Sequence, residues 1–218
     1  MCMVVAIDGP AGAGKSTIAK KIAEHSRMFY LNSGNFYRAI TFSALQNGVD
    51  PLDETKIIDE AKKCSLSLDN GRMHLNGVDI EDELHTDAVD RWVAEHSAIV
   101  AVRHVVNKKL RAVSKDIDVV AEGRDITTVV FPDADLKVYL DATPEVRAKR
   151  RFDQGTSKLS YQEIVENIKK RDKIDKNKPF GSLTIAPDAF YLDTSDLTID
   201  QVCDRVVGKI RNEKKLER

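Results

Sequence analysis

The sequence predicts an α/β protein with a mostly parallel sheet covered by helices on both faces. Short apolar, β-branched runs alternate with longer segments of helical periodicity, as in successive βαβ units. The first run, residues 4–7, leads into a glycine-rich loop. Directly after that loop, Ile18, Ile22 and Ala23 recur at helical spacing. These observations place a buried strand, a tight loop and a helix at the start of the chain.

The glycine-rich loop fits the pattern G-x-x-x-x-G-K-[ST] of phosphate-binding P-loops. Glycines allow backbone N–H groups to face an anion, and the helix that follows adds partial positive charge. Lys15 would reach the β- and γ-phosphates of a nucleotide, and the Ser16 hydroxyl would ligate Mg²⁺. The expected nucleotide-binding residues are Gly9, Pro10, Ala11, Gly12, Ala13, Gly14, Lys15, Ser16 and Thr17.

The middle of the chain has a different pattern from the alternating strands and helices around it. Leu66 and Leu68 alternate with polar residues before Asn70-Gly71, and Met73 and Leu75 do so after it. Asn-Gly between such runs predicts a hairpin, which marks an insertion in the βαβ series. We expect Asn76-Gly77 to end the second run. Core strands are expected at 29–31, 117–121, 136–140 and 190–192, and helices from Asn32–Asn35 onward, at 53–63, and at 87–113 in two pieces.

Three helix starts carry recognisable capping residues. Thr143-Pro144 combines a capping hydroxyl with proline at the first helical position. Ser160 with Glu163, and Thr198 with Gln201, have the spacing of capping boxes. These signals fix the beginnings of the last three helices.

Composition excludes several function classes. The 218 residues carry a net charge of −1, with 42% hydrophobic and 32% charged residues, which gives no global attraction to nucleic acid or acidic membranes. No apolar run approaches the roughly 20 residues that span a bilayer. Cys2, Cys64 and Cys203 lie far apart, as expected of small filler residues in a reducing compartment. We expect a cytoplasmic monomer.

Charged residues follow the predicted strands at the edge where ligands of such sheets collect. Arg38, the Arg124-Asp125 pair and the helix after Thr143 occupy three of the four segments at that edge. That helix carries Arg147, Arg150 and Arg151, expected on one face, before a polar loop suited to a mobile lid. Phosphoryl transfer needs fixed cations more than a general base, so this set indicates a kinase-like site.

The helix from Ser160 has a stripe of apolar residues on its buried face, and charged residues continue this stripe toward the end of the helix. Ile164 and Ile168 continue as Arg171 or Asp172 and then Asp175. We therefore expect the end of this helix to enter a cleft.

Together these residues resemble the bacterial-type cytidylate kinase family over nearly the whole chain. The Gly-Arg-Asp segment running into Thr-Val-Val-Phe-Pro-Asp-Ala and the Arg-Asp-x-x-Asp spacing are the most specific parts. The matching stretches are 7–17, Ser33-Gly34 with 37–39, 122–125 with 128–134, Arg147 with 150–151, 171–172 with Asp175, and 188–189 with 192–194.

The resemblance implies transfer of the γ-phosphoryl group of ATP to CMP or dCMP, with Mg²⁺. It implies a P-loop NTPase-type three-layer sandwich with a five-stranded parallel core sheet. The core would comprise 1–63, 101–150 and 160–218, with an NMP-binding insertion at about 64–100 and a lid at about 150–160.

The resemblance also assigns roles to residues. Lys15, Arg124, Arg147 and Arg151 would act in catalysis, the last two by clamping the transferring group from the lid. Arg38 and Arg124 would hold the acceptor phosphate, with Ser33 close to the nucleotide and Arg171 near the phosphates. Arg103 and Asp125 would read cytosine, because a donor and an acceptor match an edge that uracil presents differently. Asp175 would bond the sugar hydroxyl, beside Lys178.

Two positions depart from the family pattern. Ala94 stands where the family usually has a base-contacting Ser, and Lys178 where it usually has Arg. Lysine lacks the planar fork of arginine, so the two are not equivalent at a bidentate site. Either Asn177, Lys178 or Ser97 substitutes, or base discrimination is weaker.

Two other function classes are compatible with a P-loop. One is a kinase of another small acceptor, such as UMP, another nucleoside monophosphate or shikimate. The other is a GTPase-like or non-catalytic nucleotide-binding module. Residues 177–180 read Asn-Lys-Pro-Phe and lack the Asp of the Asn-Lys-x-Asp guanine motif.

Overall fold

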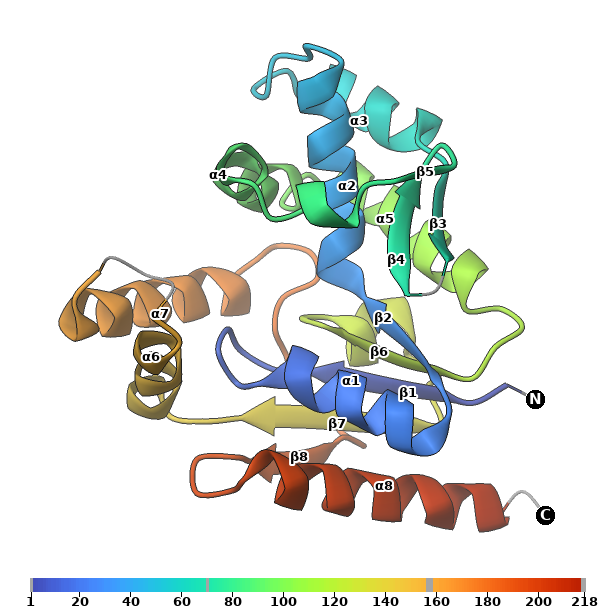
Figure 1. The fold of residues 1–218 in the computed structure, drawn as a ribbon, viewed down its shortest axis with the longest axis vertical. Helices are drawn as coiled ribbons and strands as arrows, with labels where there is room; N and C mark the ends of the chain where they lie inside the picture. Colours follow the sequence, from blue (N-terminus) through green and yellow to red (C-terminus); the bar gives the residue numbers. More distant parts are fainter. Residues whose placement is uncertain (1, 70, 156–158, 217–218) are drawn as a thin grey trace. The chain divides into compact units, whose positions relative to one another are not determined.

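The chain divides into two compact units in a computed structural model that describes residues 2–69, 71–155 and 159–216 (Figure 1). Unit 1 comprises Met1–Tyr30 and Ile117–Arg218, and unit 2 comprises Leu31–Asp116. Unit 1 contains the P-loop. The insertion expected at 64–100 lies inside unit 2, which also includes the helices on either side of it.

Unit 1 is built on the predicted five-stranded parallel sheet, in the order β2-β6-β1-β7-β8. The central strand β1 (Val4–Asp8) pairs in parallel with β6 (Val119–Gly123) and β7 (Leu136–Asp141). At one edge β7 pairs with β8 (Phe190–Asp193), while β2 (Phe29–Asn32) forms the other edge. The register sets Asp8 opposite Gly123, so the P-loop and the segment after β6 leave the sheet at the same end.

Two helices, α1 (Lys15–Ser26) and α8 (Ile199–Leu216), pack with the sheet into one hydrophobic core. Its fully buried members include Ile7, Ile22 and Val206. Burying a side chain of this size stabilises the fold by roughly 1.5–3 kcal/mol relative to leaving it exposed. This core fixes α1, and therefore the loop that precedes it, on the sheet.

The helices α6 (Pro144–Asp153) and α7 (Tyr161–Lys176) lie side by side in unit 1 (Figure 1). They share a small core that includes Ala148, Ile164 and Ile168. Both begin with the predicted caps: Thr143 accepts a hydrogen bond from the Val146 N–H, and the capping box of α7 is complete in both directions. Thr198 and Gln201 likewise exchange hydrogen bonds at the start of α8.

The expected lid at about 150–160 lies partly outside the described residues, because 156–158 are not described. On its described sides, Phe152 and Tyr161 form an edge-to-face pair with ring centroids 6.2 Å apart. This pair links the end of α6 to the start of α7.

Unit 2 contains four α-helices, a short 3-10 helix (Glu81–Glu83) and a small antiparallel sheet within its described residues. Its strands β3 (Leu66–Asp69) and β4 (Arg72–Leu75) form the predicted hairpin. The expectation that Asn76-Gly77 ends the second run is incomplete: both residues have positive φ and turn the chain into β5 (Val78–Asp79), which pairs with β4. The helices are α2 (Ser33–Gln46), α3 (Glu54–Lys63), α4 (Asp87–His96) and α5 (Val100–Val113).

One strand boundary in the core differs from the expected one, and a turn that was not expected follows that strand. The strand expected at 117–121 is β6, two residues later, so Glu122 and Gly123 are strand residues. A π-helical turn, Ile126–Val130, follows Asp125. Cys2, Cys64 and Cys203 are free thiols. Among the described helices, none combines the length and the apolar character needed to span a membrane.

Candidate active site

The P-loop follows a path that its glycines make possible. Gly9 has φ +155°, and a Cβ at this position would lie 2.0 Å from the Leu140 carbonyl oxygen. Gly12 has φ +80°, and its Cβ would lie 3.1 Å from the Cβ of Arg147. Positive φ and close approach both exclude larger residues. The loop is therefore seated against β7 and α6.

Lys15 points into the loop that precedes it. Its ammonium donates a 2.9 Å hydrogen bond to the Pro10 carbonyl oxygen, and the residue is 6% exposed. Burial and the neighbouring Arg124 lower the pKa of Lys15, Glu122 and Asp8 act in the opposite direction, and the resulting pKa is about 7. A phosphate bound beside this ammonium would stabilise its charged form.

Ser16 and Glu122 are joined at the base of the loop. The Ser16 hydroxyl donates a 2.7 Å hydrogen bond to Glu122 Oε1, and the Tyr30 hydroxyl donates to the same oxygen over 3.1 Å. Glu122 is 4% exposed. Mg²⁺ at nucleotide sites takes one or two protein oxygens and completes its octahedron with phosphates and waters. A hydroxyl and a carboxylate therefore fit this ion, although no group of three or more His, Cys, Asp or Glu among the described residues could hold a metal by itself.

Asp175, at the end of α7, gathers three of the predicted cations. Its carboxylate lies 2.8 Å from Lys178 Nζ, 3.1 Å from Arg124 Nε and 3.9 Å from Arg171 Nε. Burial alone would raise the pKa of Asp175, but Arg124, Lys178 and Arg171 together hold it below its ordinary value. The predicted ionic continuation of the α7 stripe is confirmed, and Asp175 is 4% exposed.

The three arginines of α6 are spaced three and four residues apart on one helix, as expected, but each makes different contacts. Arg147 is 2% exposed and donates to the carbonyl oxygens of Ala142 and Ala11 and to Asp172 of α7. Arg150 donates to the hydroxyl and carbonyl of Thr194. Arg151 is exposed and has no hydrogen bond or ion pair with any described residue. A helical turn is only approximately four residues, so small angular differences direct these long side chains to different neighbours.

Asp125 lies in a turn whose backbone is held from β1. It is 4% exposed. The next two N–H groups, of Ile126 and Thr127, donate to the Asp8 carboxylate over 2.9 Å and 2.8 Å, and the Thr127 hydroxyl donates over 2.6 Å. Burial raises the pKa of Asp8, while these three hydrogen bonds lower it and nearby Asp125 raises it.

Unit 2 holds Ser33, Arg38 and Arg103, each on a helix. Ser33 begins α2 and is buried, after Asn32, whose side chain caps the helix through the Gly34 N–H. Arg38 donates a 2.9 Å hydrogen bond to the Leu84 carbonyl oxygen and pairs with Asp90 of α4. Its guanidinium is thus bound by groups of its own unit.

Arg103, on α5, is almost fully buried. It donates a 3.0 Å hydrogen bond to the Ser97 carbonyl oxygen, and its guanidinium lies 5.5 Å from the centre of the Tyr37 ring. The Ser97 hydroxyl donates to the carbonyl oxygen of Ala94. Of the substitutes proposed for the two departures from the family pattern, Ser97 therefore already has an acceptor, Asn177 donates to the Lys173 carbonyl oxygen, and Lys178 is paired with Asp175.

Sequence reasoning did not assign roles to Asp8 and Glu122. Each stands at the carboxyl end of a core strand, Asp8 one residue before the P-loop and Glu122 two residues before Arg124. An acidic residue at the end of an otherwise apolar strand was the signal that could have identified both. Asp90 gave no such signal, since it resembles any acidic residue of a surface helix.

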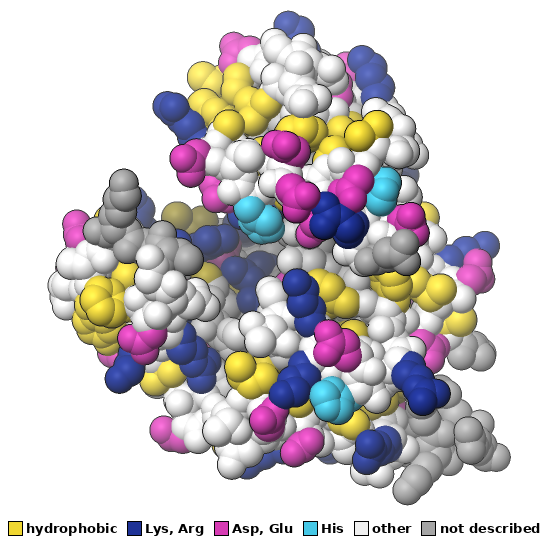
Figure 2. Space-filling model, in the orientation of Figure 1, with side chains coloured by type: hydrophobic (Ala, Val, Ile, Leu, Met, Phe, Trp, Pro, Cys, Tyr) yellow, Lys and Arg dark blue, Asp and Glu magenta, His cyan; other side chains and the backbone are white. Residues whose placement is uncertain are grey.

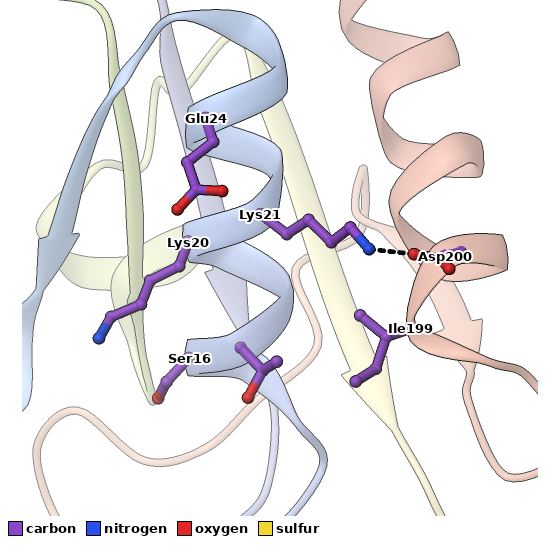
Figure 3. A pocket seen from close by; sticks show the side chains of 7 residues that line it. Ser16, Lys20, Lys21, Glu24, Ile199 and Asp200 are labelled. Atoms are coloured by element: carbon purple, nitrogen blue, oxygen red, sulfur yellow. Dashed lines mark hydrogen bonds and ion pairs between the residues drawn. The ribbon is translucent and has the colours of Figure 1, made fainter.

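A surface cavity of about 500 Å³ opens beside Ser16 and Thr17. Lys21 reaches from α1 to Asp200 at the start of α8, next to Ile199, whereas Lys20 lies on the other side of α1 (Figure 3). Acidic and basic side chains are intermixed over the face of unit 1 that carries α1 (Figure 2). The charge around this opening is therefore set by local ion pairs, such as Lys21 with Asp200, and not by a large area of one sign.

Comparison with known proteins agrees with this geometry. The sequence model of the cytidylate kinase family matches residues 5–212. A cytidylate kinase of Caldanaerobacter subterraneus subsp. tengcongensis is 42% identical over 216 residues, covering 98% of this chain and 96% of that protein. A cytidylate kinase of Borreliella burgdorferi is 39% identical, covering 99% of this chain and 100% of that protein. Among solved structures, shikimate kinase from Acinetobacter baumannii has a TM-score of 0.52 at 16% identity, covering 98% of this chain and 96% of that chain. This last likeness supports the P-loop kinase fold alone.

Proposed function

This chain belongs to the cytidylate kinase family, and from that premise we propose that it transfers the γ-phosphoryl group of ATP to CMP or dCMP. The products are ADP and CDP or dCDP. The observation that carries the proposal is the phosphate cradle of Lys15 and Ser16 beside Glu122, in a chain that matches the family over residues 5–212.

The donor nucleotide binds along Gly9–Thr17. Backbone N–H groups of the loop and of the first turn of α1 face the phosphates, and the Lys15 ammonium offsets their charge. Ser16, supported by Glu122, would hold Mg²⁺. The ion, when bound, neutralises charge on the phosphate oxygens.

Transfer is an in-line displacement. A phosphate oxygen of CMP forms the new bond to the γ-phosphorus, and the bond to the oxygen shared with the β-phosphate breaks, with its electron pair leaving on ADP. The attacking oxygen is already anionic, so stabilisation of the equatorial oxygens matters more than proton removal. We assign this stabilisation to Lys15, Arg124, Arg147 and Arg151.

Acceptor recognition uses residues of each unit. In unit 2, Arg38 binds the acceptor phosphate, Ser33 lies near the nucleotide and Arg103 reads the base. In unit 1, Arg124 binds the phosphate and Asp125 reads the cytosine amine. The remaining unit 1 residues of this set are Arg171, Asp175 and Lys178, of which Asp175 accepts from the sugar hydroxyl. The NMP-binding role of residues 64–100 and the lid at about 150–160 belong to the same proposal.

The competing acceptors are distinguishable in one assay. The purified chain is given ATP, Mg²⁺ and, separately, CMP, dCMP, UMP, AMP or shikimate, with ADP release coupled to NADH oxidation. We expect kcat/KM to be highest for CMP and dCMP. Equal use of UMP would favour a broader pyrimidine kinase, and absence of any diphosphate product would contradict the proposal. Size-exclusion chromatography with light scattering tests the further proposal of a monomer, and cell fractionation tests a cytoplasmic location.

A further inference from the structure

Asp8 is a fully buried carboxylate that makes no contact with solvent. It is the last residue of β1, directly before Gly9, and its exposed fraction is 0%. Transferring a charged group from water into such a place is costly unless donors compensate it. The hydrogen bonds that compensate it come from N–H and O–H groups of one short segment.

That segment is the turn that begins the π-helical stretch after β6. Asp8 Oδ1 accepts from the Ile126 N–H at 2.9 Å, and Oδ2 accepts from the Thr127 N–H at 2.8 Å and the Thr127 hydroxyl at 2.6 Å. Both carboxylate oxygens are used, so the carboxylate plane is fixed. Hydrogen bonds to an ionised acceptor are shorter and stronger than those between neutral groups.

The same turn carries the acceptor-binding residues. Ile126 directly follows Arg124 and Asp125 in the chain, and the β1–β6 register sets Asp8 opposite Gly123, the residue before them. One carboxylate therefore joins the strand that leads into the P-loop to the segment that carries Arg124 and Asp125. Without it, two backbone N–H groups and a hydroxyl in the interior would lose their acceptor.

We propose that Asp8 is a positioning residue for acceptor recognition, which fixes the Arg124–Asp125 turn relative to the P-loop. The inference rests on the proposed function, because it takes Asp125 as the residue that reads cytosine. Asp8 itself touches no substrate. Its effect reaches the acceptor through the backbone of residues 125–127.

The decisive variant is Asp8→Asn, which keeps the shape of the side chain. Its amide nitrogen is a donor, so it cannot accept from the N–H group that it would face. We expect the KM for CMP to rise by about tenfold and the kcat/KM preference for CMP over UMP to fall by a similar factor, the usual scale for one lost buried hydrogen bond to a charged group. The KM for ATP should change by less than about twofold, since the P-loop backbone keeps its own contacts.

Asp118→Asn is the matched control. Asp118 Oδ1 accepts from the Met3 N–H at 2.8 Å, a side-chain bond between the same two segments at the opposite end of the β1–β6 pair. If Asp8 were only structural, both variants would lower the Tm and neither would change the CMP-to-UMP ratio. The inference requires the ratio to change in Asp8→Asn and not in Asp118→Asn.

A second pair of variants tests the positioning role of Asp8 if Asp8→Asn does not fold. Thr127→Val removes one of the three bonds, and Thr127→Ser restores it. We expect the valine variant to relax selectivity by about threefold to tenfold and the serine variant to recover it. An unchanged CMP-to-UMP ratio in folded Asp8→Asn, or in Thr127→Val where that variant must serve, overturns the inference. Failure of the unaltered chain to phosphorylate CMP would instead overturn the proposed function.

Discussion

The Ser16 hydroxyl and the Glu122 carboxylate are joined by a 2.7 Å hydrogen bond in unit 1. One residue comes from the first turn of α1 and the other from the end of β6, which neighbours β1 in the sheet. The pair fixes the hydroxyl rotamer at the base of the phosphate loop. It thus places two oxygen donors where the metal–nucleotide complex is expected to bind.

Loss of the Ser16 hydroxyl or of the Glu122 negative charge should alter the metal requirement. We expect Ser16→Ala and Glu122→Gln each to raise the Mg²⁺ concentration for half-maximal activity by about tenfold or more, because small divalent ions depend on few protein oxygens. The measurement is activity at fixed ATP over a Mg²⁺ titration. Tyr30→Phe, which removes only the other hydrogen bond to Glu122, is the control. An unaltered Mg²⁺ midpoint in both test variants would exclude these residues from the metal site.

Lys15→Ala should lower kcat by about a hundredfold to a thousandfold, the scale for removing one preorganised charge-stabilising group. The folded protein should keep its Tm, since the buried ammonium has its pKa lowered to about 7 by desolvation and its loss removes that cost. Single-turnover phosphoryl transfer and thermal unfolding provide the two readouts. Near-normal turnover would count heavily against the mechanism.

Asp125→Ala should raise the KM for CMP by about tenfold to a hundredfold and relax the preference over UMP, because a buried group that reads a base penalises the wrong one by leaving partners unpaired. Asp125→Asn tests the same idea with little change in volume. Competition between CMP and UMP at equal concentration measures the ratio directly. If the ratio stays constant in both variants, Asp125 does not read the base.

Asp90→Asn should lower the KM for CMP modestly. Asp90 pairs with Arg38, so the acceptor phosphate has to compete with a carboxylate for that guanidinium. Asp90 is half-exposed, and exposed pairs contribute little, so the expected change is about twofold to fivefold. Asp87→Asn, on the same turn of α4, is the control. A raised KM would show that Asp90 instead helps to hold Arg38 in its binding position.

Stability should fall as the pH drops below the ordinary pKa of histidine, because of His96. Burial lowers the pKa of this residue below 6.5, although the hydrogen bond to the Pro51 carbonyl oxygen at 3.1 Å acts in the opposite direction; the other ring nitrogen lies 3.0 Å from the Thr41 hydroxyl. The unfolded chain therefore binds the proton first, so His96 favours the folded state above pH 6.5 and loses this contribution as the pH falls toward its folded pKa.

The slope for one such group is about 1.4 kcal/mol per pH unit between its two pKa values. Urea unfolding at several pH values between about 7.5 and 5 measures it. His96→Gln should flatten the slope, whereas the exposed His25→Gln should leave it intact. A slope that persists in His96→Gln would assign it to other groups.

The sequence predicts best those features that depend on near neighbours in the chain. The P-loop, the Ser160–Glu163 capping box and the Asn-Gly turn of the hairpin each combine residues a few positions apart, so their geometry follows from backbone chemistry. The burial of Asp175 was foreseeable because helical spacing put that carboxylate on the buried stripe of α7.

Features that depend on contacts between distant segments were not predictable. Arg147 donates to Ala11, 136 positions away, and Asp8 accepts from Thr127, 119 positions away. Nothing in the local pattern distinguishes Arg147 from Arg151, one turn later, although one is buried and the other exposed. Long side chains respond to the three-dimensional neighbourhood, which only the assembled sheet defines.

The central place of β1 has a consequence for how the chain acquires its structure. Among the described residues, β1 pairs with β6, from Val119 onward, and with β7, from Leu136 onward. Until β6 and β7 have been synthesised, this apolar segment lacks both of its lateral partners. Such pairing between distant segments slows folding and prolongs the exposure of apolar side chains and unpaired strand edges. We therefore expect the nascent chain to spend a longer time as a chaperone substrate than a helical protein of equal length.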